Sequence, residues 1–154
     1  GNKFNDFAQD LTLAQLLQLA NKRLMHLSDR YRIDQPTDEE DDSLVAIDEH
    51  MGRQRRSIKT LSGGETFILS LALALALSDL ASRNIEINSL FIDEGFGTLD
   101  PETLDQTLDT LEVLQAESSK MIGVISHVES LKERIATQIQ LTQNGQGYSN
   151  LKIA

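Results

Sequence analysis

The segment "SLFIDEGFGTLD", residues 89–100, contains a run of apolar residues that ends in two adjacent acids, Asp93 and Glu94. A short apolar run of this kind predicts a buried strand of a parallel sheet. In open α/β sheets, ligands bind beyond the carboxyl ends of the strands, so both acids fall where a ligand site is expected. The segment therefore predicts an α/β fold with a site at the end of this strand.

The two adjacent carboxylates favour Mg²⁺ as part of that ligand. Like charges repel, so a buried pair needs a cation or a raised pKa. Mg²⁺ takes oxygen ligands, keeps several waters and uses one or two carboxylates together with phosphates. The second carboxylate would then polarise an attacking water as a general base. A calcium-binding EF-hand loop is excluded because Gly95 and Phe96 stand where oxygen ligands belong, whereas a strand end whose acids simply face solvent remains an alternative.

A second segment, "TLSGGET" at residues 60–66, predicts the start of a helix. Ser62 and Glu65 match the capping-box spacing, which by itself explains a well-capped buried helix. A capping box does not need Gly63 and Gly64, and glycine costs about 1 kcal/mol in a helix. Two glycines therefore indicate that something approaches the backbone closely. Because a helix N-terminus attracts anions, a phosphate is the natural candidate beside the purely structural explanation.

The rest of the chain predicts strands that alternate with helices. Residues 11–30 form a helix whose apolar residues step by four and three, which fits either a helix packed on a core or the base of a coiled coil. The other expected elements are an acidic loop at 34–43, a strand at 44–50, a basic loop at 51–60, a buried helix at about 63–82, a strand at 87–93, a helix from Pro101 to about Glu117 capped by Asp100, a strand at 120–126, a short helix within 127–135, and a hairpin that pairs 137–143 with 148–154. This order indicates an α/β layer with a largely parallel sheet and flanking helices.

The composition limits the classes of function. The 154 residues carry 14 Lys and Arg against 24 Asp and Glu, a formal net charge of −10, which argues against a protein that coats nucleic acid. The absence of cysteine excludes disulfides and thiolate metal sites and fits a reducing cytoplasm. No signal peptide is visible, and the longest apolar run, residues 67–81, is expected to be too short to span a bilayer.

Two features remain open when taken singly. A basic cluster, consisting of Arg53, Arg55, Arg56 and Lys59, is either a solvated loop, a contact to DNA or a partner, or a brace for the helix that starts at 63. His127 follows an apolar strand, where a lone histidine is usually a structural hydrogen-bonding group. If that strand lies beside 87–93, His127 becomes a candidate sensor of a γ-phosphate.

The order of these motifs resembles that of ABC-type ATPases. "LSGGE" at 61–65 looks like the signature motif, "LFIDEGFGTLD" at 90–100 like the Walker B motif and D-loop, and "SH" at 126–127 like the switch histidine. The final glutamate of "LSGGE" is more similar to the SMC-like branch than to transporters, where glutamine is commoner. The resemblance covers essentially the whole chain and points to the members of this branch that are ATPase subunits of bacterial DNA-repair nucleases.

The resemblance implies a role for each site residue. In the signature motif, formed by Ser62, Gly63, Gly64 and Glu65, the serine and the second glycine would contact the γ-phosphate of ATP held by the opposite subunit. Asp93 would hold Mg²⁺, Glu94 would activate the attacking water and His127 would contact the γ-phosphate. Asp100 would belong to the D-loop at the dimer interface.

The phosphate-binding P-loop, G-x-x-x-x-G-K-[ST], is absent from the sequence. The resemblance therefore implies the C-terminal lobe of an ATPase head, residues 31–154, with residues 1–30 as the base of a coiled coil. Its implied partners are the N-terminal lobe of the same ATPase, a second ATPase head, a nuclease subunit and DNA, with no membrane. The implied complex is an ATP-dependent exonuclease or endonuclease, and the fragment alone is expected to be inactive. The alternatives are the nucleotide-binding lobe of another ABC-type or SMC-type ATPase, including a transporter-type domain, and a non-catalytic interaction module.

Overall fold

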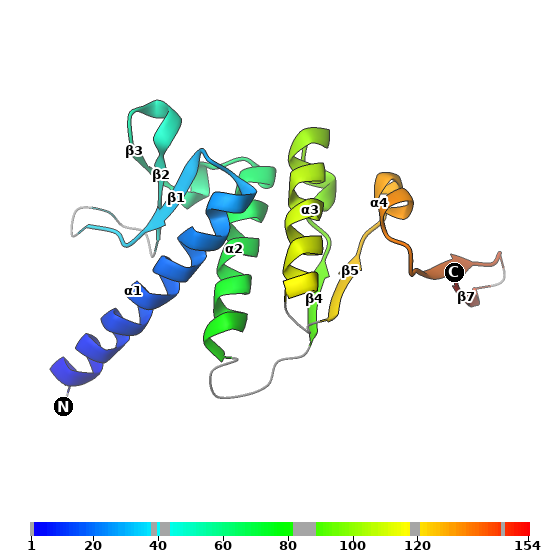
Figure 1. The fold of residues 1–154 in the computed structure, drawn as a ribbon, viewed down its shortest axis with the longest axis horizontal. Helices are drawn as coiled ribbons and strands as arrows, with labels where there is room; N and C mark the ends of the chain where they lie inside the picture. The colour runs from blue at the N-terminus through cyan, green and yellow to red at the C-terminus, as the bar shows by residue number, and fades with distance from the viewer. Residues whose placement is uncertain (1, 38–39, 41–43, 82–88, 118–120, 146) are drawn as a thin grey trace.

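The computed structural model describes residues 2–37, 40, 44–81, 89–117, 121–145 and 147–154. The described helices are α1 (Asn2–Leu27), α2 (Gly63–Ala81), α3 (Pro101–Glu117) and α4 (Glu129–Arg134), and the strands are β1 (Tyr31–Asp34), β2 (Val45–Asp48), β3 (Gln54–Ser57), β4 (Ser89–Asp93), β5 (Met121–Ile125), β6 (Ile139–Gln143) and β7 (Ser149–Ile153). Three short 3-10 turns lie between them, η1 (Glu49–Met51), η2 (Ile58–Thr60) and η3 (Phe96–Thr98). Figure 1 shows these elements following one another along the long axis of the molecule, from α1 to the C-terminal hairpin.

Helix and strand are mixed as expected for an α/β lobe, but the described strands form three separate small sheets. Strands β4 and β5 pair in parallel, with Asp93 opposite Ile125. Strands β1, β2 and β3 form an antiparallel sheet, and β6 pairs with β7 as the predicted hairpin. The predicted parallel pairing is present in β4 and β5 and the predicted hairpin in β6 and β7, whereas β2, which was expected in the parallel sheet, is antiparallel to β1 and β3.

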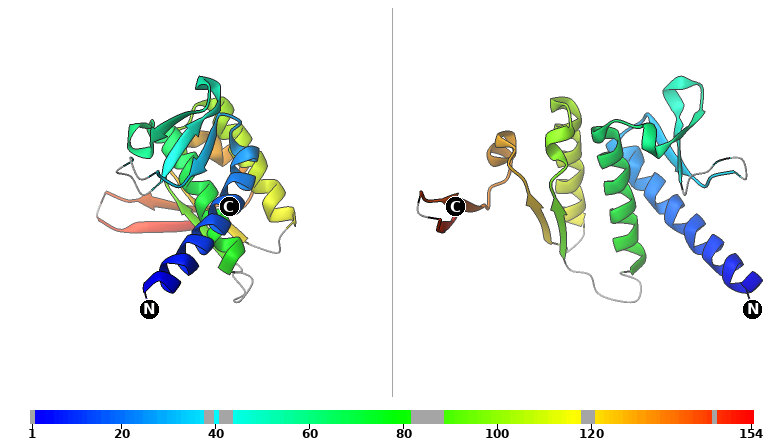
Figure 2. Two further views of the ribbon diagram at one scale, coloured as in Figure 1. Left: turned by 90° about the vertical axis from the view of Figure 1, so that its left-hand side faces the viewer. Right: turned by 180° about the vertical axis from the view of Figure 1, so that it is seen from behind.

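The core lies where α1 packs against α2. Leu17, Ala20, Leu24 and Leu27, which form most of the predicted apolar seam, are buried, and Leu13 packs at its edge. Helix α1 begins at Asn2 rather than at 11, and its N-terminal part projects away from the rest of the chain (Figure 2). In the C-terminal part of α1, the apolar seam therefore faces the core of the fold.

Helix α2 is a core helix as predicted. It is 19 residues long and, by length and composition alone, apolar enough to cross a membrane, so the expectation that this run is too short does not hold. A core helix passes the same test, and Ile68, Leu69, Ala72 and Ala76 are buried within the lobe. We therefore assign α2 to the packing of the fold.

Two strands were not expected from the sequence. Strand β1 precedes and overlaps the predicted acidic loop, and β3 lies within the predicted basic loop. Both pair with β2, which places them on its two sides. The sequence "QRRS" of β3 lacks the alternation of apolar and polar residues that signals a strand, so its pairing with β2 decides its conformation.

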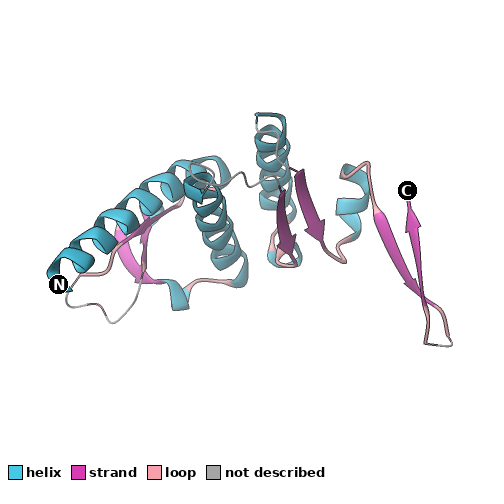
Figure 3. Cartoon of the chain, turned by 90° about the horizontal axis from the view of Figure 1, so that it is seen from below, coloured by secondary structure: helices cyan, strands magenta, loops and turns pink. Residues whose placement is uncertain are grey.

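Several predicted boundaries lie outside the described residues. These are half of the acidic loop (38–39 and 41–43), the end of the second helix at Ser82, the start of the strand at 87–88, Lys120, and Gln146 in the hairpin turn. Within the described residues, the helix from Pro101 to Glu117, the strand ending at Ile125 and the short helix α4 are confirmed. The β6–β7 hairpin extends beyond the rest of the chain at its C-terminal end (Figure 3).

Candidate functional site

The acidic pair lies at the carboxyl end of β4, where the chain turns sharply. The backbone N–H of Glu94 donates to the carbonyl oxygen of Ile125 at 2.9 Å, which continues the parallel ladder by one residue. Glu94 then adopts a left-handed conformation, with φ of 58°, and Gly95 follows with φ of 95°. Left-handed backbone is unfavourable for a residue with a side chain and is typical of functional sites.

Aromatic packing holds this turn against α2. Phe96 is fully buried and meets the ring of Phe67 edge-on, with 5.0 Å between the ring centroids. Phe67 also occupies the space that a side chain at position 95 would need, so glycine is required there. The packing of Phe96 against Phe67 therefore fixes the turn after β4, and with it the position of Glu94.

Glu94 and His127 meet at the ends of β4 and β5. His127 Nδ1 lies 3.2 Å from Glu94 Oε1 and 3.1 Å from Oε2. The side chains remain open to solvent, 82% for His127 and 51% for Glu94. The sequence made the role of His127 conditional on these two strands being neighbours, and the structure meets that condition because β4 and β5 pair in parallel.

Asp93 is exposed at the same strand end, beside Glu94. Among the residues that the structure describes, no group of three or more His, Asp or Glu side chains is arranged to hold a metal ion. An exposed single carboxylate does fit Mg²⁺, which binds through one or two carboxylates when phosphates and waters complete its shell. Asp93 therefore fits a metal shared with a phosphate ligand, and a metal held by protein groups alone does not fit.

The capping box at the start of α2 is confirmed. The backbone N–H of Ser62 donates to Glu65 Oε2 at 2.8 Å, and the N–H of Glu65 donates to Ser62 Oγ at 3.3 Å. Ser62 and Gly63 are exposed, and the N–H of Thr66 closes the first helical turn on the carbonyl oxygen of Ser62 at 2.9 Å.

The close approach predicted from the two glycines is present at Gly64, and the neighbour is the chain itself. A Cβ atom at Gly64 would lie 2.7 Å from the carbonyl oxygen of Thr98 in η3. At Gly63 a Cβ atom would meet only ordinary contacts with the Thr98 side chain, at 3.5 and 3.6 Å. Gly64 is thus explained by internal packing, and a phosphate contact at Ser62 and Gly64 stays a prediction.

Asp100 caps α3 as predicted. Its Oδ1 accepts from the backbone N–H of Thr103 at 3.0 Å, and its Oδ2 accepts from the Thr103 hydroxyl at 2.6 Å. These hydrogen bonds from Thr103 lower the pKa of Asp100. The side chain is exposed, so capping and a contact to a partner are compatible.

The predicted site residues fall into two places. Ser62, Gly64, Glu65 and Asp100 line an open hollow of about 390 Å³ together with Arg30, Tyr31 and Thr98. Asp93, Glu94 and His127 do not line it and lie together at the ends of β4 and β5. The hollow beside Ser62 and the Glu94–His127 pair are therefore two separate places on the chain.

An ionic network beside the hollow was missed in the sequence. Asp48 is fully buried and accepts hydrogen bonds from Arg30 and Arg56. The hydrogen bond from Arg30 lowers the pKa of Asp48 to about 2. Tyr31 donates its hydroxyl to Glu65 Oε1 at 2.6 Å, and burial followed by this hydrogen bond raises the pKa of Tyr31 to about 12. The sequence did offer one signal for this network. Asp48 ends the short apolar strand "VAID", and an acid that is buried there requires cationic partners.

The basic cluster is largely engaged inside the lobe. Arg56 reaches Asp48, and Arg55 pairs with Asp34 and Glu40 at 2.7 and 2.9 Å. The hydrogen bond from Arg55 holds the pKa of Glu40 at about 2. Arg53 pairs with Glu49. Arg56 thereby joins the Asp48 network that reaches the start of α2 through Arg30 and Glu65, which favours the bracing interpretation for Arg56. Arg55 holds β3 to β1 and to Glu40 and does not contact α2 within the described residues.

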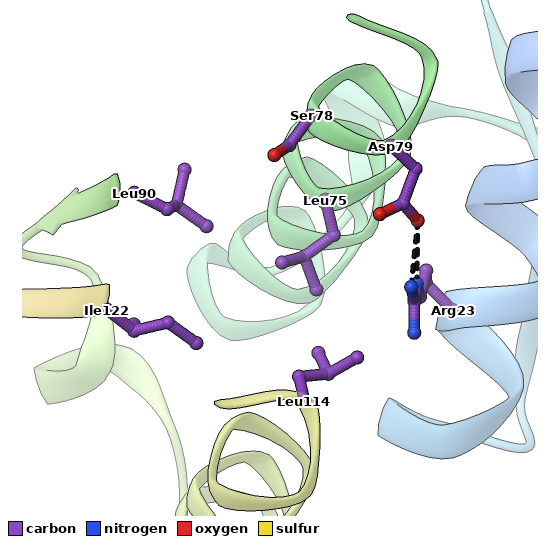
Figure 4. Close-up of a pocket in the computed structure, with 7 residues that line it drawn as sticks. All are labelled: Arg23, Leu75, Ser78, Asp79, Leu90, Leu114 and Ile122. Atoms are coloured by element: carbon purple, nitrogen blue, oxygen red, sulfur yellow. Dashed lines mark hydrogen bonds and ion pairs between the residues drawn. The ribbon is translucent and has the colours of Figure 1, made fainter. Parts of the chain in front are cut away.

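A second, much smaller hollow lies at the other end of α2 (Figure 4). It measures about 30 Å³, close to the volume of one water molecule, and is lined by Leu75, Leu90, Leu114 and Ile122 with Ser78. At its rim, Arg23 donates to Asp79 Oδ2 at 3.0 and 2.8 Å and ties α1 to α2. Its size leaves no room for a nucleotide.

The chain is similar to known proteins in sequence and in fold. Residues 43–113 match a family described as "SbcC/RAD50-like, Walker B motif". The chain is 47% identical over 99% of its length to the SbcC subunit of the SbcCD nuclease of Pseudomonas aeruginosa, and 34% identical over 99% of its length to the "Probable DNA double-strand break repair Rad50 ATPase" of Aquifex aeolicus. Its fold is similar to that of an SMC head bound to the C-terminal winged-helix domain of ScpA, with a TM-score of 0.71 and 18% identity over 99% of this chain and 45% of that chain.

The fold and these matches define a fragment of an SMC-type ATPase head. Within this class, the chain belongs to the SbcC/Rad50-like family. It spans only 12% of the length of the Pseudomonas relative and 16% of the length of the Aquifex relative.

Proposed function

We propose that this chain is the C-terminal half of an ATP-hydrolysing head in a nuclease complex that processes DNA double-strand ends. It supplies the signature motif at residues 62–65, the Walker B acids Asp93 and Glu94, the D-loop residue Asp100 and the switch histidine His127. The observation that carries the proposal is the contact of Glu94 with His127, because it places a general base and a second polar group at the strand ends where α/β proteins bind ligands.

Glu94 acts as the general base in this proposal. Its carboxylate accepts a proton from the attacking water, while His127 Nδ1 holds the carboxylate in one orientation. The left-handed backbone at Glu94 costs about 1–3 kcal/mol and is held by the turn that Phe96 anchors against Phe67. In the doubly protonated ring, Nδ1–H donates to the Glu94 carboxylate and Nε2–H is left to donate to a phosphate oxygen. Asp93 is the proposed ligand of Mg²⁺, which neutralises charge on the phosphates when it is bound.

Ser62 can cap its helix and bind a phosphate at the same time. Its hydroxyl oxygen accepts the bond from Glu65, so its own proton is available to donate to a phosphate oxygen. The positive end of the α2 dipole favours an anion at the same place. In the proposed arrangement, that anion is the γ-phosphate of ATP bound to a second head, since this chain lacks a P-loop.

The exposed apolar surface supports a partner lobe. On the outer side of the β4–β5 pair, Phe91, Met121 and Ile125 are more than half exposed. The same holds on the hairpin for Ile139, Leu141, Tyr148, Leu151 and Ile153. Exposed apolar patches mark interaction surfaces, and a two-stranded sheet is marginal unless further strands or a helix pack against it. We assign this surface to the N-terminal lobe, which would bring the P-loop.

The other proposed partners follow from the family. Residues 1–30 are the proposed base of a coiled coil, near which an SbcD-type nuclease subunit docks, and residues 31–154 are the proposed lobe. A second head and DNA complete the complex, which is placed in the cytoplasm.

The test is Glu94→Gln in the full-length protein. The amide keeps the shape of the side chain and removes the base, so ATP should bind normally and hydrolysis should slow by about 10²–10⁴-fold. ATP binding and single-turnover hydrolysis are measured on the same preparation. Turnover at the wild-type rate would show that another residue is the base, and absence of ATP binding by the wild-type protein would favour a non-catalytic module.

A further inference from the structure

The Glu65 carboxylate joins the start of α2 to the segment that follows α1. One oxygen, Oε2, accepts from the backbone N–H of Ser62 at 2.8 Å. The other, Oε1, accepts from the Tyr31 hydroxyl at 2.6 Å and from Arg30 Nη1 at 3.1 Å. The orientation of the Ser62 turn is therefore linked through a single side chain to residues more than thirty positions earlier in the chain.

Arg30 is itself held in place. Its Nη2 donates to Asp48 Oδ2 at 2.9 Å and its Nε donates to Asp48 Oδ1 at 3.2 Å. The guanidinium thus binds the buried Asp48 through two nitrogens and Glu65 through the third, Nη1. The guanidinium carbon also lies 4.9 Å from the centroid of the Tyr31 ring. A planar fork of this kind leaves the guanidinium little freedom, and lysine cannot reproduce it.

The charge on Glu65 is maintained by these partners. Burial opposes the charged form, but the hydrogen bonds from Tyr31 and Ser62 outweigh it, and the pKa of Glu65 is lowered. The carboxylate is thus an acceptor on both sides, which a bridging role requires.

We propose that Arg30 and Tyr31 are positioning residues of the signature turn, which hold the Glu65 carboxylate and through it set the backbone and hydroxyl of Ser62 for a phosphate. This inference rests on the proposed function, because it assigns the residues that orient the proposed phosphate contact. Neither residue belongs to the signature motif.

The experiment compares Arg30→Lys with Arg55→Lys in the full-length protein. Arg55 is a matched control, because it also pairs with two carboxylates beside the same sheet, Asp34 and Glu40, and its hydrogen bonds within the described part of the chain go to these acids and to the Gln35 carbonyl oxygen. The kcat for ATP hydrolysis, the Kd for ATP and the melting temperature are measured for each variant. Both variants should melt earlier than the wild type, since each loses a bidentate ion pair.

The expected difference is in catalysis. Arg30→Lys should lower kcat about tenfold, the effect of losing a hydrogen bond to a charged group, with the Kd for ATP unchanged. Arg55→Lys should leave kcat within about twofold of the wild type. If Arg30→Lys does not fold, Tyr31→Phe takes its place, since it removes the short hydroxyl bond to Glu65 together with a longer one from Arg56 Nη1 at 3.5 Å. Tyr148→Phe on the exposed hairpin is its control.

A double-mutant cycle with Ser62→Ala separates positioning from general stability. If Arg30 acts through the Ser62 turn, Arg30→Lys should lower kcat little further when Ser62 is already alanine, whereas independent effects would multiply. Multiplied effects, or equal kcat for Arg30→Lys and Arg55→Lys, would overturn the inference and leave the proposed function standing. A wild-type kcat for Ser62→Ala alone would overturn the phosphate role of Ser62, and the inference with it.

Discussion

Gly64 shows how one residue can serve packing in a place where a ligand is expected. The carbonyl oxygen of Thr98 lies where a side chain at position 64 would begin, at 2.7 Å from the ideal Cβ position. Glycine here allows the turn after β4 to pack against the first turn of α2. The contact brings the two motifs of the sequence, "LSGGE" and "FGTLD", together at one point of the fold.

We predict that Gly64→Ala destabilises the chain although alanine favours helices. In an open helix the substitution would stabilise by about 1 kcal/mol, but here the added methyl group must displace the backbone of η3. Overpacking of this kind costs about 1–3 kcal/mol. Gly63→Ala is the control, because its methyl group meets only ordinary contacts. Urea unfolding of both variants gives the comparison, and an equal gain in stability for the two would contradict the close contact.

We also predict that His127→Ala separates catalysis from folding. The side chain is 82% exposed, so its removal should leave the melting temperature almost unchanged. Hydrolysis should fall, because Glu94 loses the group that orients it. Both quantities are measured on the full-length variant. A lower melting temperature with normal turnover per folded molecule would make His127 a structural residue.

At the scale of elements, the β1–β2–β3 sheet carries most of the ionic interactions near the hollow. Asp48 lies at the end of the central strand β2, fully buried, and receives Arg30 from one side and Arg56 from the other. Burial of a carboxylate is unfavourable unless it is paired and hydrogen-bonded, and both conditions are met here. The sheet therefore acts as a brace between α1 and α2.

This arrangement predicts a loss of stability in acid. The pKa of Asp48 is about 2 in the folded protein against an ordinary value of 3.8, so the unfolded chain takes up the proton first as the pH falls. The stability that Asp48 contributes should be complete above about pH 4 and should be lost as the pH falls towards 2. Asp48→Asn should be less stable at neutral pH and should lose less of its stability between about pH 5 and pH 3. Urea unfolding at both pH values tests this, and parallel losses in the two proteins would contradict it.

At the scale of the whole molecule, the chain is an extended row of elements (Figures 1 and 2). Part of its apolar surface is uncovered. Most of the exposed large apolar side chains lie on β4, β5 and the hairpin, in the C-terminal half of the chain. A half-head whose sheet continues into another lobe has this appearance, because its inner surface becomes a core only after the second lobe docks.

The isolated 154-residue chain should therefore bind ATP weakly and hydrolyse none detectably. Mixing it with the N-terminal lobe of the same ATPase should restore hydrolysis, because that lobe would contribute the P-loop and cover the exposed apolar residues. The measurement is phosphate release with and without the second lobe, using Glu94→Gln as a negative control. Strong hydrolysis by the isolated chain would contradict the half-site arrangement.

Local signals in the sequence were sufficient for much of the lobe. The capping box at Ser62, the Asp100–Pro101 start of α3, the apolar strands β4 and β5 and the closing hairpin are present as predicted. Each depends on residues within a few positions of one another, and the hydrophobic pattern and cap geometry that define them are properties of short segments. The adjacency of Glu94 and His127 was expected only on the condition that their strands are neighbours, and the pairing of β4 with β5 in the folded structure supplied that condition.

Only the tertiary structure decided the remaining features. Strands β1 and β3 exist because they pair with β2, and the sequence of β3 alone favours a loop. The link from Asp48 through Arg30 to Glu65 joins residues that are 18 and 35 positions apart, and the approach of Thr98 to Gly64 is similarly distant along the chain. Such contacts are set by how α1, α2, the β1–β2–β3 sheet and the turn after β4 pack together. Packing depends on the shape and charge of whole surfaces. For that reason, the sequence determined where the chemical groups lie along the chain, and the folded structure determined which of them hold one another in place.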